Sequence, residues 1–228
     1  MFARRALFVL LAAAWPSIAF AQAKAPGFQL QVDGVLYSPS GTVESVGGTQ
    51  LSSLLPSGPG FAIGGSIGFA RRWLVAARVA YFGSNQDGSF RFVDDLNTTG
   101  QPFADGSGPY ALNRELHVTN VHGLLQYRRP LGNRMLWELE LGGGVSQSRE
   151  RLVLDSATGE KASAVGVQFD PSFAAGACLG YQAGWNTDVV GGLRWSKSLT
   201  GDGAVWTDGD SPSFMNWSLG VRYPHDTH

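Results

Sequence analysis

Side chains between Gly60 and Gly83 alternate between two kinds with a period of two residues. One set of alternate positions, from Phe61 to Tyr81, is mostly large and apolar. The positions between them are mostly glycine, alanine and serine, with Arg78 as their one charged residue. A period of two indicates β-strands, because successive side chains of a strand point to opposite faces. The break at Ala70–Arg72 predicts a tight turn, so the segment is expected to form an antiparallel hairpin with one large apolar face and one small face.

The same alternation recurs along the chain and predicts eight strands. They are Phe28–Tyr37, Gly60–Ala70, Trp73–Gly83, Arg114–Tyr127, Met135–Ser148, Ala164–Tyr181, Trp185–Ser198 and Phe214–Tyr223. Three of their connections are short, namely Ala70–Arg72, Arg128–Arg134 and Gln182–Gly184. The other four are long and polar, namely Ser38–Pro59, Ser84–Asn113, Arg149–Ser163 and Leu199–Ser213.

Short turns at one end and long loops at the other are typical of β-barrels in bacterial outer membranes, where the short turns face the periplasm. A strand of about ten residues that is tilted by about 40° rises roughly 25 Å, which matches the apolar band of such barrels. The expected fold is therefore all-β: an eight-stranded antiparallel up-and-down transmembrane barrel with four long extracellular loops. The large apolar face of each strand would contact lipid, and the small face would line the interior.

Aromatic residues recur in the lipid-facing phase at the short-turn end of the predicted strands. They are Phe28, Phe69, Trp73, Tyr127, Trp137, Tyr181, Trp185 and Tyr223. Aromatic rings of this kind belong at the level of the lipid headgroups, where an apolar body meets water. We therefore expect an aromatic girdle at the periplasmic interface. Arg71, Arg72, Arg128, Arg129 and Arg134 also fall at the short turns, where they are expected to contact anionic headgroups.

The N-terminus has the pattern of a secretory signal: Arg4 and Arg5, then an apolar run, then Ala19-Phe20-Ala21. The expected organisation is a signal peptide over residues 1–21, a linker over 22–27, the barrel over 28–223 and a tail over 224–228. Removal of the signal changes the formal charge from −1 to −3, because it removes two arginines and no acids. That mild balance argues against a nucleic-acid partner. The single cysteine, Cys178, has no internal disulfide partner and is interpreted as a small inward-facing residue.

With its alternation, loop asymmetry and aromatic last strand, the chain resembles the small eight-stranded outer-membrane barrels, such as the membrane domain of outer-membrane protein A and the outer-membrane proteins X and W. The segment Trp217–Tyr223 is similar to the terminal signal that these proteins present to the barrel assembly machinery. It departs from their pattern because residues 224–228 follow the aromatic. The resemblance implies an outer-membrane location among phospholipids and lipopolysaccharide.

Charged residues in the inward phase are the candidate functional residues. They are Asp33, Arg78, Glu138, Glu140, Asp188, Arg194 and Arg222, with His122 among them. An isolated buried charge costs several kcal/mol, so these residues are expected to pair across the lumen and to close it. No metal site or cofactor is expected. The predicted function is therefore that of a non-enzymatic barrel whose loops serve recognition or envelope maintenance.

Other interpretations of the same residues stay open. His122 with Asp33 or Glu140 has the chemistry to activate a nucleophile, as in a barrel enzyme that modifies lipid A, although no lipid A deacylase-type pairing of histidine and serine is found. A narrow conduit for small solutes and a soluble ligand-binding barrel are further alternatives. The alternations Ser89–Val93 and Arg151–Asp155 suggest strands that rise beyond the membrane. Such strands either extend the barrel wall or expose edges to an unknown partner.

Overall fold

The computed structural model of the chain describes residues 27–40, 42–43, 49–50, 57–90, 110–155, 161–184, 186–199, 202–204, 207–208 and 213–224. The predicted signal segment 1–21, most of the linker and the tail from residue 225 lie outside these residues. In the part of the chain that is described, no helix is both long enough and apolar enough to cross a membrane.

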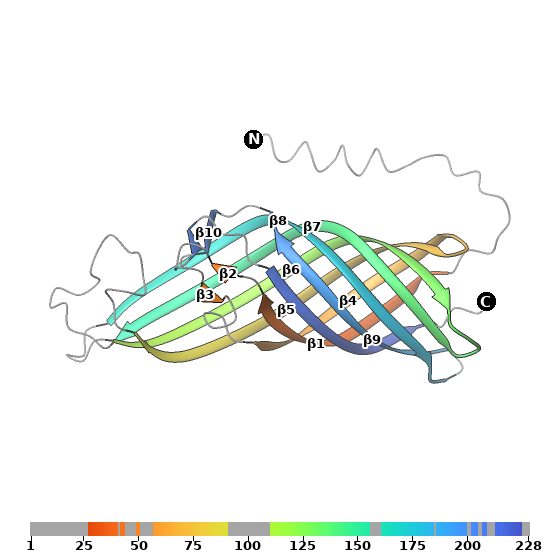
Figure 1. The fold of residues 1–228 in the computed structure, drawn as a ribbon, viewed down its shortest axis with the longest axis horizontal. Helices are drawn as coiled ribbons and strands as arrows, with labels where there is room; N and C mark the ends of the chain where they lie inside the picture. The colour runs from red at the N-terminus through yellow and green to blue at the C-terminus, as the bar shows by residue number, and fades with distance from the viewer. Residues whose placement is uncertain are drawn as a thin grey trace.

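Eight strands form one closed antiparallel barrel (Figure 1). They are β1 (Gln29–Ser40), β4 (Gly58–Ala70), β5 (Trp73–Phe90), β6 (Tyr110–Pro130), β7 (Met135–Asp155), β8 (Lys161–Gln182), β9 (Asp188–Ser198) and β12 (Ser213–Tyr223). Each strand pairs with its neighbours in this order, and β12 closes the ring against β1. The prediction of an all-β, eight-stranded up-and-down barrel is confirmed.

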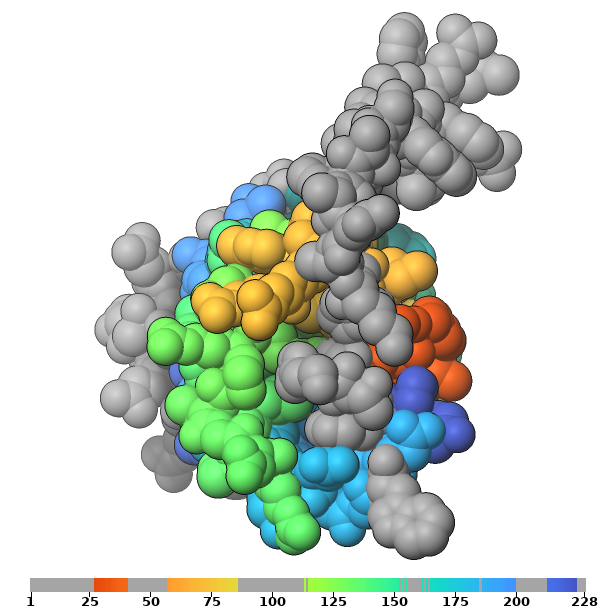
Figure 2. Space-filling view, turned by 90° about the vertical axis from the view of Figure 1, so that its right-hand side faces the viewer, coloured from red at the N-terminus to blue at the C-terminus, as the bar shows by residue number. Residues whose placement is uncertain are grey.

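Two short strand pairs lie in the long connections, β2 (Thr42–Val43) with β3 (Thr49–Gln50), and β10 (Asp202–Ala204) with β11 (Thr207–Asp208). The three short turns lie at the opposite end of the barrel, together with the first residues of β1 and the last residues of β12. Figure 2 shows this end of the barrel end-on. The predicted asymmetry between turns and loops is therefore present.

Seven of the eight barrel strands are longer than the alternation predicted, and the difference is largest for β5 to β8, which shorten two of the predicted loops most. Pairing between β5 and β6 continues to Phe90 opposite Tyr110, and pairing between β7 and β8 continues to Asp155 opposite Lys161. The loop boundaries Ser84–Asn113 and Arg149–Ser163 were therefore wrong, because the ladder hydrogen bonds continue through their ends. The extension predicted from Arg151–Asp155 is part of β7, whereas residues 91–109 lie outside the described part of the chain. Figure 1 shows β5 to β8 projecting past the other strands at the loop end.

One barrel strand, β9, is shorter than predicted. β9 starts at Asp188 rather than Trp185, because the Ala183 amide donates a hydrogen bond to the Thr187 carbonyl (3.0 Å) and closes a wider turn. Trp185 itself lies outside the described residues.

The barrel is inverted relative to a water-soluble protein: most of its large apolar residues are on the outside, and a group of charged residues is buried inside. Leu139 is 47% exposed and Leu219 is 66% exposed, whereas Glu138 and Arg222 are each 1% exposed. Exposed aliphatic residues recur around the ring, on each of the eight barrel strands. A continuous apolar exterior over a closed sheet is what bilayer hydrocarbon requires, since closure leaves no unpaired strand edge in contact with lipid.

Candidate functional site: the charged lumen

All eight predicted lumen residues are buried inside the barrel. Asp33, Arg78, His122, Glu138, Glu140, Asp188, Arg194 and Arg222 are each at most 7% exposed. They come from six different strands, so contacts among them hold together opposite walls of the barrel.

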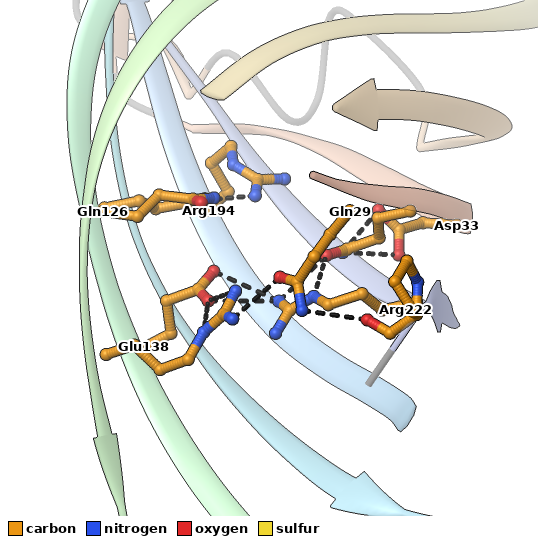
Figure 3. A network of polar contacts seen from close by, with 10 residues as sticks. Gln29, Asp33, Gln126, Glu138, Arg194 and Arg222 are labelled. Carbon is orange, nitrogen blue, oxygen red and sulfur yellow. Dashed lines mark hydrogen bonds and ion pairs between the residues drawn. The ribbon is translucent and has the colours of Figure 1, made fainter. Parts of the chain in front are cut away.

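Glu138 of β7 lies between two arginines near the turn end (Figure 3). Arg128 of β6 donates a hydrogen bond from Nε to Glu138 Oε2 at 2.9 Å, and its Nη2 lies 2.8 Å from the same oxygen as an ion pair. Arg222 of β12 approaches the same carboxylate from across the barrel, with Nη2 at 3.1 Å from Oε2. Gln29 of β1 accepts a further hydrogen bond from Arg128 Nη1 at 2.7 Å. One carboxylate therefore links β6 and β7 to β12.

The contacts continue from Arg222 along β1 to β5. Arg222 Nε and Nη2 donate to Gln31 Oε1 at 3.1 and 3.0 Å. Gln31 Nε2 donates to both oxygens of Asp33, at 2.9 and 3.1 Å. Asp33 in turn lies 2.6 Å from Nη2 of Arg78. We call this connected set, Gln29, Gln31, Asp33, Arg78, Arg128, Glu138 and Arg222, the basal network.

A second group of contacts lies beside it. Arg194 of β9 forms an ion pair with Glu140 of β7 through Nη2 and Oε1. Gln126 of β6 donates from Nε2 to Glu140 Oε2 at 3.4 Å. Gly176 of β8 stands directly between the two charged residues in register, and a methyl group built on it would lie 2.6 Å from Glu140 Oε1. The absence of a side chain at that position leaves room for the ion pair.

The charges of four arginines in these two groups are balanced by those of four acids. The arginines are Arg78, Arg128, Arg194 and Arg222, and the acids are Asp33, Glu138, Glu140 and Asp188. Asp188 is fully buried at the start of β9 and lies directly opposite Arg222 in the strand register. A balanced, hydrogen-bonded set of charges avoids the desolvation penalty of an isolated buried ion.

Arg128 corrects the prediction that it contacts lipid headgroups. It is only 3% exposed and belongs to the basal network. β6 continues past the predicted turn boundary to Pro130, so the alternation that points Tyr127 outward points Arg128 inward. Extension of the two-residue period by one position would have identified it. Arg71, Arg72, Arg129 and Arg134 are exposed at the turn end.

His122 does not contact Asp33 or Glu140 in the way a nucleophile-activating group would. Its Nε2 lies 2.9 Å from Oγ of Ser172 on β8, and both residues are 4% exposed. Ser172 was not predicted as its partner, because fifty residues separate the two positions and only the barrel register brings them together. A pair enclosed by the barrel wall has no contact with lipid outside it.

Glu138, Glu140 and Cys178 place one ligand atom each within 4.8 Å of one another. This is the donor set of a possible metal site. Both carboxylates already contact arginines, however, and a cation there would have to displace or lie against the guanidinium groups. The arrangement therefore favours ion pairing over metal binding.

An aromatic cluster crosses the lumen on the loop side of these charges. Tyr37 of β1 stacks on Phe82 of β5 and on Phe214 of β12, with ring centroids 3.3 and 4.5 Å apart. Leu116 and Val118 of β6 complete the cluster. Its members are all buried, so it fills the interior from β12 to β6. The sequence analysis did not single out this cluster.

The predicted girdle residues lie at the turn end with different degrees of exposure. Phe28, Trp73, Tyr181 and Tyr223 are exposed, Phe69, Tyr127 and Trp137 are half-buried, and Trp185 lies outside the described residues. Tyr127 contacts the rings of both Trp73 and Trp137, with centroids 5.0 and 5.7 Å apart. Phe69 falls at a register shift between Gly68 and Ala70, where β4 turns into β5.

No family model matches the chain, and no curated protein matches it. Solved structures do. A major outer membrane protein from Thermus thermophilus covers 86% of this chain and 99% of its own, with 11% identity and a TM-score of 0.50. Neisserial surface protein A covers 89% and 99%, with 14% identity and a TM-score of 0.49. The outer membrane protease OmpT from Escherichia coli covers 90% and 99%, with 10% identity and a TM-score of 0.46.

The match to the Thermus thermophilus protein shows a shared fold, and an identity this low does not transfer an activity. The fold and the apolar exterior together define the class. The chain is an integral β-barrel protein of the bacterial outer membrane, as its resemblance to the small eight-stranded barrels implied.

Proposed function

We propose that this barrel is a non-enzymatic protein with a closed lumen, and that its extracellular side serves recognition or maintenance of the envelope. The observation that carries the proposal is the position of Glu138, which joins arginines from opposite walls at 1% exposure. A solute would have to separate these charges to pass.

The lumen is blocked at two levels. The basal network occupies the turn end, and the cluster of Tyr37, Phe82 and Phe214 occupies the loop side. The first barrier is ionic and the second is apolar, so the two exclude different solutes. A continuous conduit for either polar or apolar molecules would have to open both.

Planar-bilayer recordings test the closed lumen. The wild-type protein is expected to show no conductance steps. Steps in the wild type whose size changes when Glu138 or Phe82 is substituted would show that solute passes through the lumen and would refute the proposal. The same preparation run on a heat-modifiability gel establishes that the barrel is folded.

Lipid A chemistry tests the non-enzymatic role. Mass spectra of lipid A from cells that express the wild type are expected to match those from cells that express His122→Asn. Ser172→Ala serves as the paired variant, because it removes the other member of the hydrogen bond. A mass difference that depends on His122 would establish an enzyme.

We further propose that residues 1–21 are removed, which gives a mature N-terminus at Gln22, and that the terminal strand is the signal read by the assembly machinery.

The projecting part of the barrel, formed by β5 to β8, supports contact with lipopolysaccharide or another surface partner, because it presents its strands beyond the membrane. Identification of what co-purifies from native membranes in mild detergent tests the partner. N-terminal sequencing of the mature protein tests the cleavage site.

A further inference from the structure

The junction between β1 and β12, which we call the seam, differs from every other junction in the barrel wall. In each other pair of neighbours, one strand is the next barrel strand along the chain, so a turn or a loop joins the two at one end. β1 and β12 lie at opposite ends of the barrel sequence and pair from Leu30 opposite Tyr223 to Ser40 opposite Ser213. At the turn end the chain does not join them, and free ends of this kind open locally unless other contacts hold them.

Two glutamines on the inner face of β1 bridge the turn end of the seam. Gln29 Nε2 donates a hydrogen bond to the Pro224 carbonyl at 2.9 Å, although 195 positions separate the two residues in the sequence. Gln31 Oε1 accepts hydrogen bonds from Arg222 Nε and Nη2, at 3.1 and 3.0 Å. These bonds run from β1 to the end of β12 and to the residue that follows it, so they exist only while the seam is closed.

The same two amides also belong to the basal network. Gln29 Oε1 accepts a hydrogen bond from Arg128 of β6 at 2.7 Å, and Gln31 Nε2 donates one to Asp33 at 2.9 Å. A carboxamide carries both an acceptor and donors, so each glutamine makes one contact across the seam and one within the network. Gly220 of β12 leaves room for this arrangement, because a methyl group built on it would collide with the Asp33 side chain.

We propose that Gln29 and Gln31 form a latch that holds the turn end of the seam shut. Closure of the seam completes the basal network. The network in turn resists separation of β12 from β1, because opening would leave buried charged groups without partners. The latch also keeps the backbone groups of both strand edges paired, as bilayer hydrocarbon requires. The proposal goes beyond a closed lumen, since it assigns the buried charges a second role in the wall itself.

A uniform contribution to stability is the alternative. Loss of the two amides would then weaken every strand pair alike, because the barrel would unfold as one unit. A latch predicts a local effect, in which only the turn end of the seam loses protection from hydrogen exchange. The loop end has contacts of its own and is expected to stay closed: Ser40 and Ser213 lie 3.2 Å apart through their Oγ atoms, and Tyr37 stacks on Phe214.

The test uses the full-length mature protein in detergent micelles, the double variant Gln29→Ala/Gln31→Ala and the control Gln126→Ala. Gln126 is a buried glutamine of β6 whose hydrogen bond runs to Glu140 of β7, away from the seam. It therefore controls for the loss of a buried amide from the lumen. Migration on a heat-modifiability gel confirms that each variant is folded.

Hydrogen–deuterium exchange followed by NMR compares two groups of backbone amides. The seam group comes from residues 30–34 and 219–223, and the wall group comes from residues 121–125 of β6 and 141–145 of β7. Both groups are expected to exchange slowly in the wild type. In the double variant the seam group is expected to exchange at least about tenfold faster, because a hydrogen bond to a charged group contributes a factor of this size or more. The wall group in the double variant, and the seam group in Gln126→Ala, are expected to change by less than about twofold.

Unchanged exchange at the seam of the folded double variant, or an equal acceleration at the seam and in the wall, would overturn the proposal. Fast exchange at the seam of the wild type would do the same. If the double variant does not fold, Gln29→Glu decides the question, because it keeps the acceptor for Arg128 and places an oxygen against the Pro224 carbonyl. Faster exchange confined to the seam is expected in that variant, and unchanged exchange there would refute the latch.

Discussion

Replacement of Glu138 by glutamine is the sharpest test of the charged lumen. The substitution keeps the shape of the side chain and removes its charge. Arg128 and Arg222 would then face each other across the barrel base with one neutral amide between them. That amide offers a single acceptor oxygen, and its NH₂ group would be directed at the remaining guanidinium.

The size of the effect follows from the contacts. Glu138 is 1% exposed, so water does not replace the lost carboxylate oxygen. Loss of one member of a buried ion pair costs about 3–5 kcal/mol. The lower end of that range applies, because Arg128 keeps Gln29 at 2.7 Å and Arg222 keeps Gln31 at 3.0 Å. A loss of about 3 kcal/mol corresponds to a shift of more than a hundredfold in the folding equilibrium, since about 1.4 kcal/mol is tenfold.

Urea unfolding of the barrel in lipid vesicles, followed by tryptophan fluorescence and by heat-modifiable migration, measures this difference. Glu115→Gln is the matched control. Glu115 pairs with Arg151 at 3.8 Å, and the two side chains are 35% and 54% exposed. An exposed pair of this kind contributes about 0–1 kcal/mol. The reasoning fails if Glu138→Gln unfolds within about 0.5 kcal/mol of the wild type, or if the two variants lose the same amount.

Three further outcomes are expected. Arg128→Ala should lower the free energy of unfolding by about 3 kcal/mol, because Arg128 is buried in the basal network. Arg129→Ala, at the exposed neighbouring residue, should lie within about 0.5 kcal/mol of the wild type. Equal urea midpoints for the two variants would contradict the interior placement of Arg128. Leu141→Arg places a cation on the lipid-facing surface, at a position that is 54% exposed in the absence of lipid. It should make folding into vesicles less favourable by about 2–4 kcal/mol. An unchanged folding free energy would argue against contact between Leu141 and lipid hydrocarbon. Cys178, 5% exposed, should resist maleimide in the folded barrel and react after unfolding; rapid labelling of the folded form would show an open lumen.

The period of two determined most of the fold in advance, because a closed sheet gives each residue only two orientations. Leu139 and Glu138 are adjacent in sequence and opposite in environment, and a single choice of which face is inside assigned both. The same period, carried one residue further, would also have placed Arg128. That error came from locating the turn by composition, since Arg128 and Arg129 look alike in a polar segment.

Contacts across the barrel could not be read from the sequence in the same way. The pairing of Arg222 with Glu138, or of His122 with Ser172, depends on the register that accumulates around eight strands and on which side chains have room to extend. The aromatic cluster of Tyr37, Phe82 and Phe214 was missed for the same reason. Each of its rings looks unremarkable on its own strand, and only closure of the barrel brings them together.

The unequal strand lengths give the barrel a sloping outer rim. Toward the loop end, Ser172 is the last residue of β8 that pairs with β9, and β8 extends beyond it for 11 more residues, up to Lys161. At about 3.3 Å per residue and a tilt of about 40°, this extension has a height of roughly 25 Å. A bulky molecule that approaches from outside the cell would touch this crest first, because the barrel strands β9, β12, β1 and β4 end lower. An epitope tag inserted between Asp155 and Lys161 should consequently be readily stained on intact cells that carry long surface polysaccharide, and the same tag inserted between Ser40 and Thr42 should be shielded.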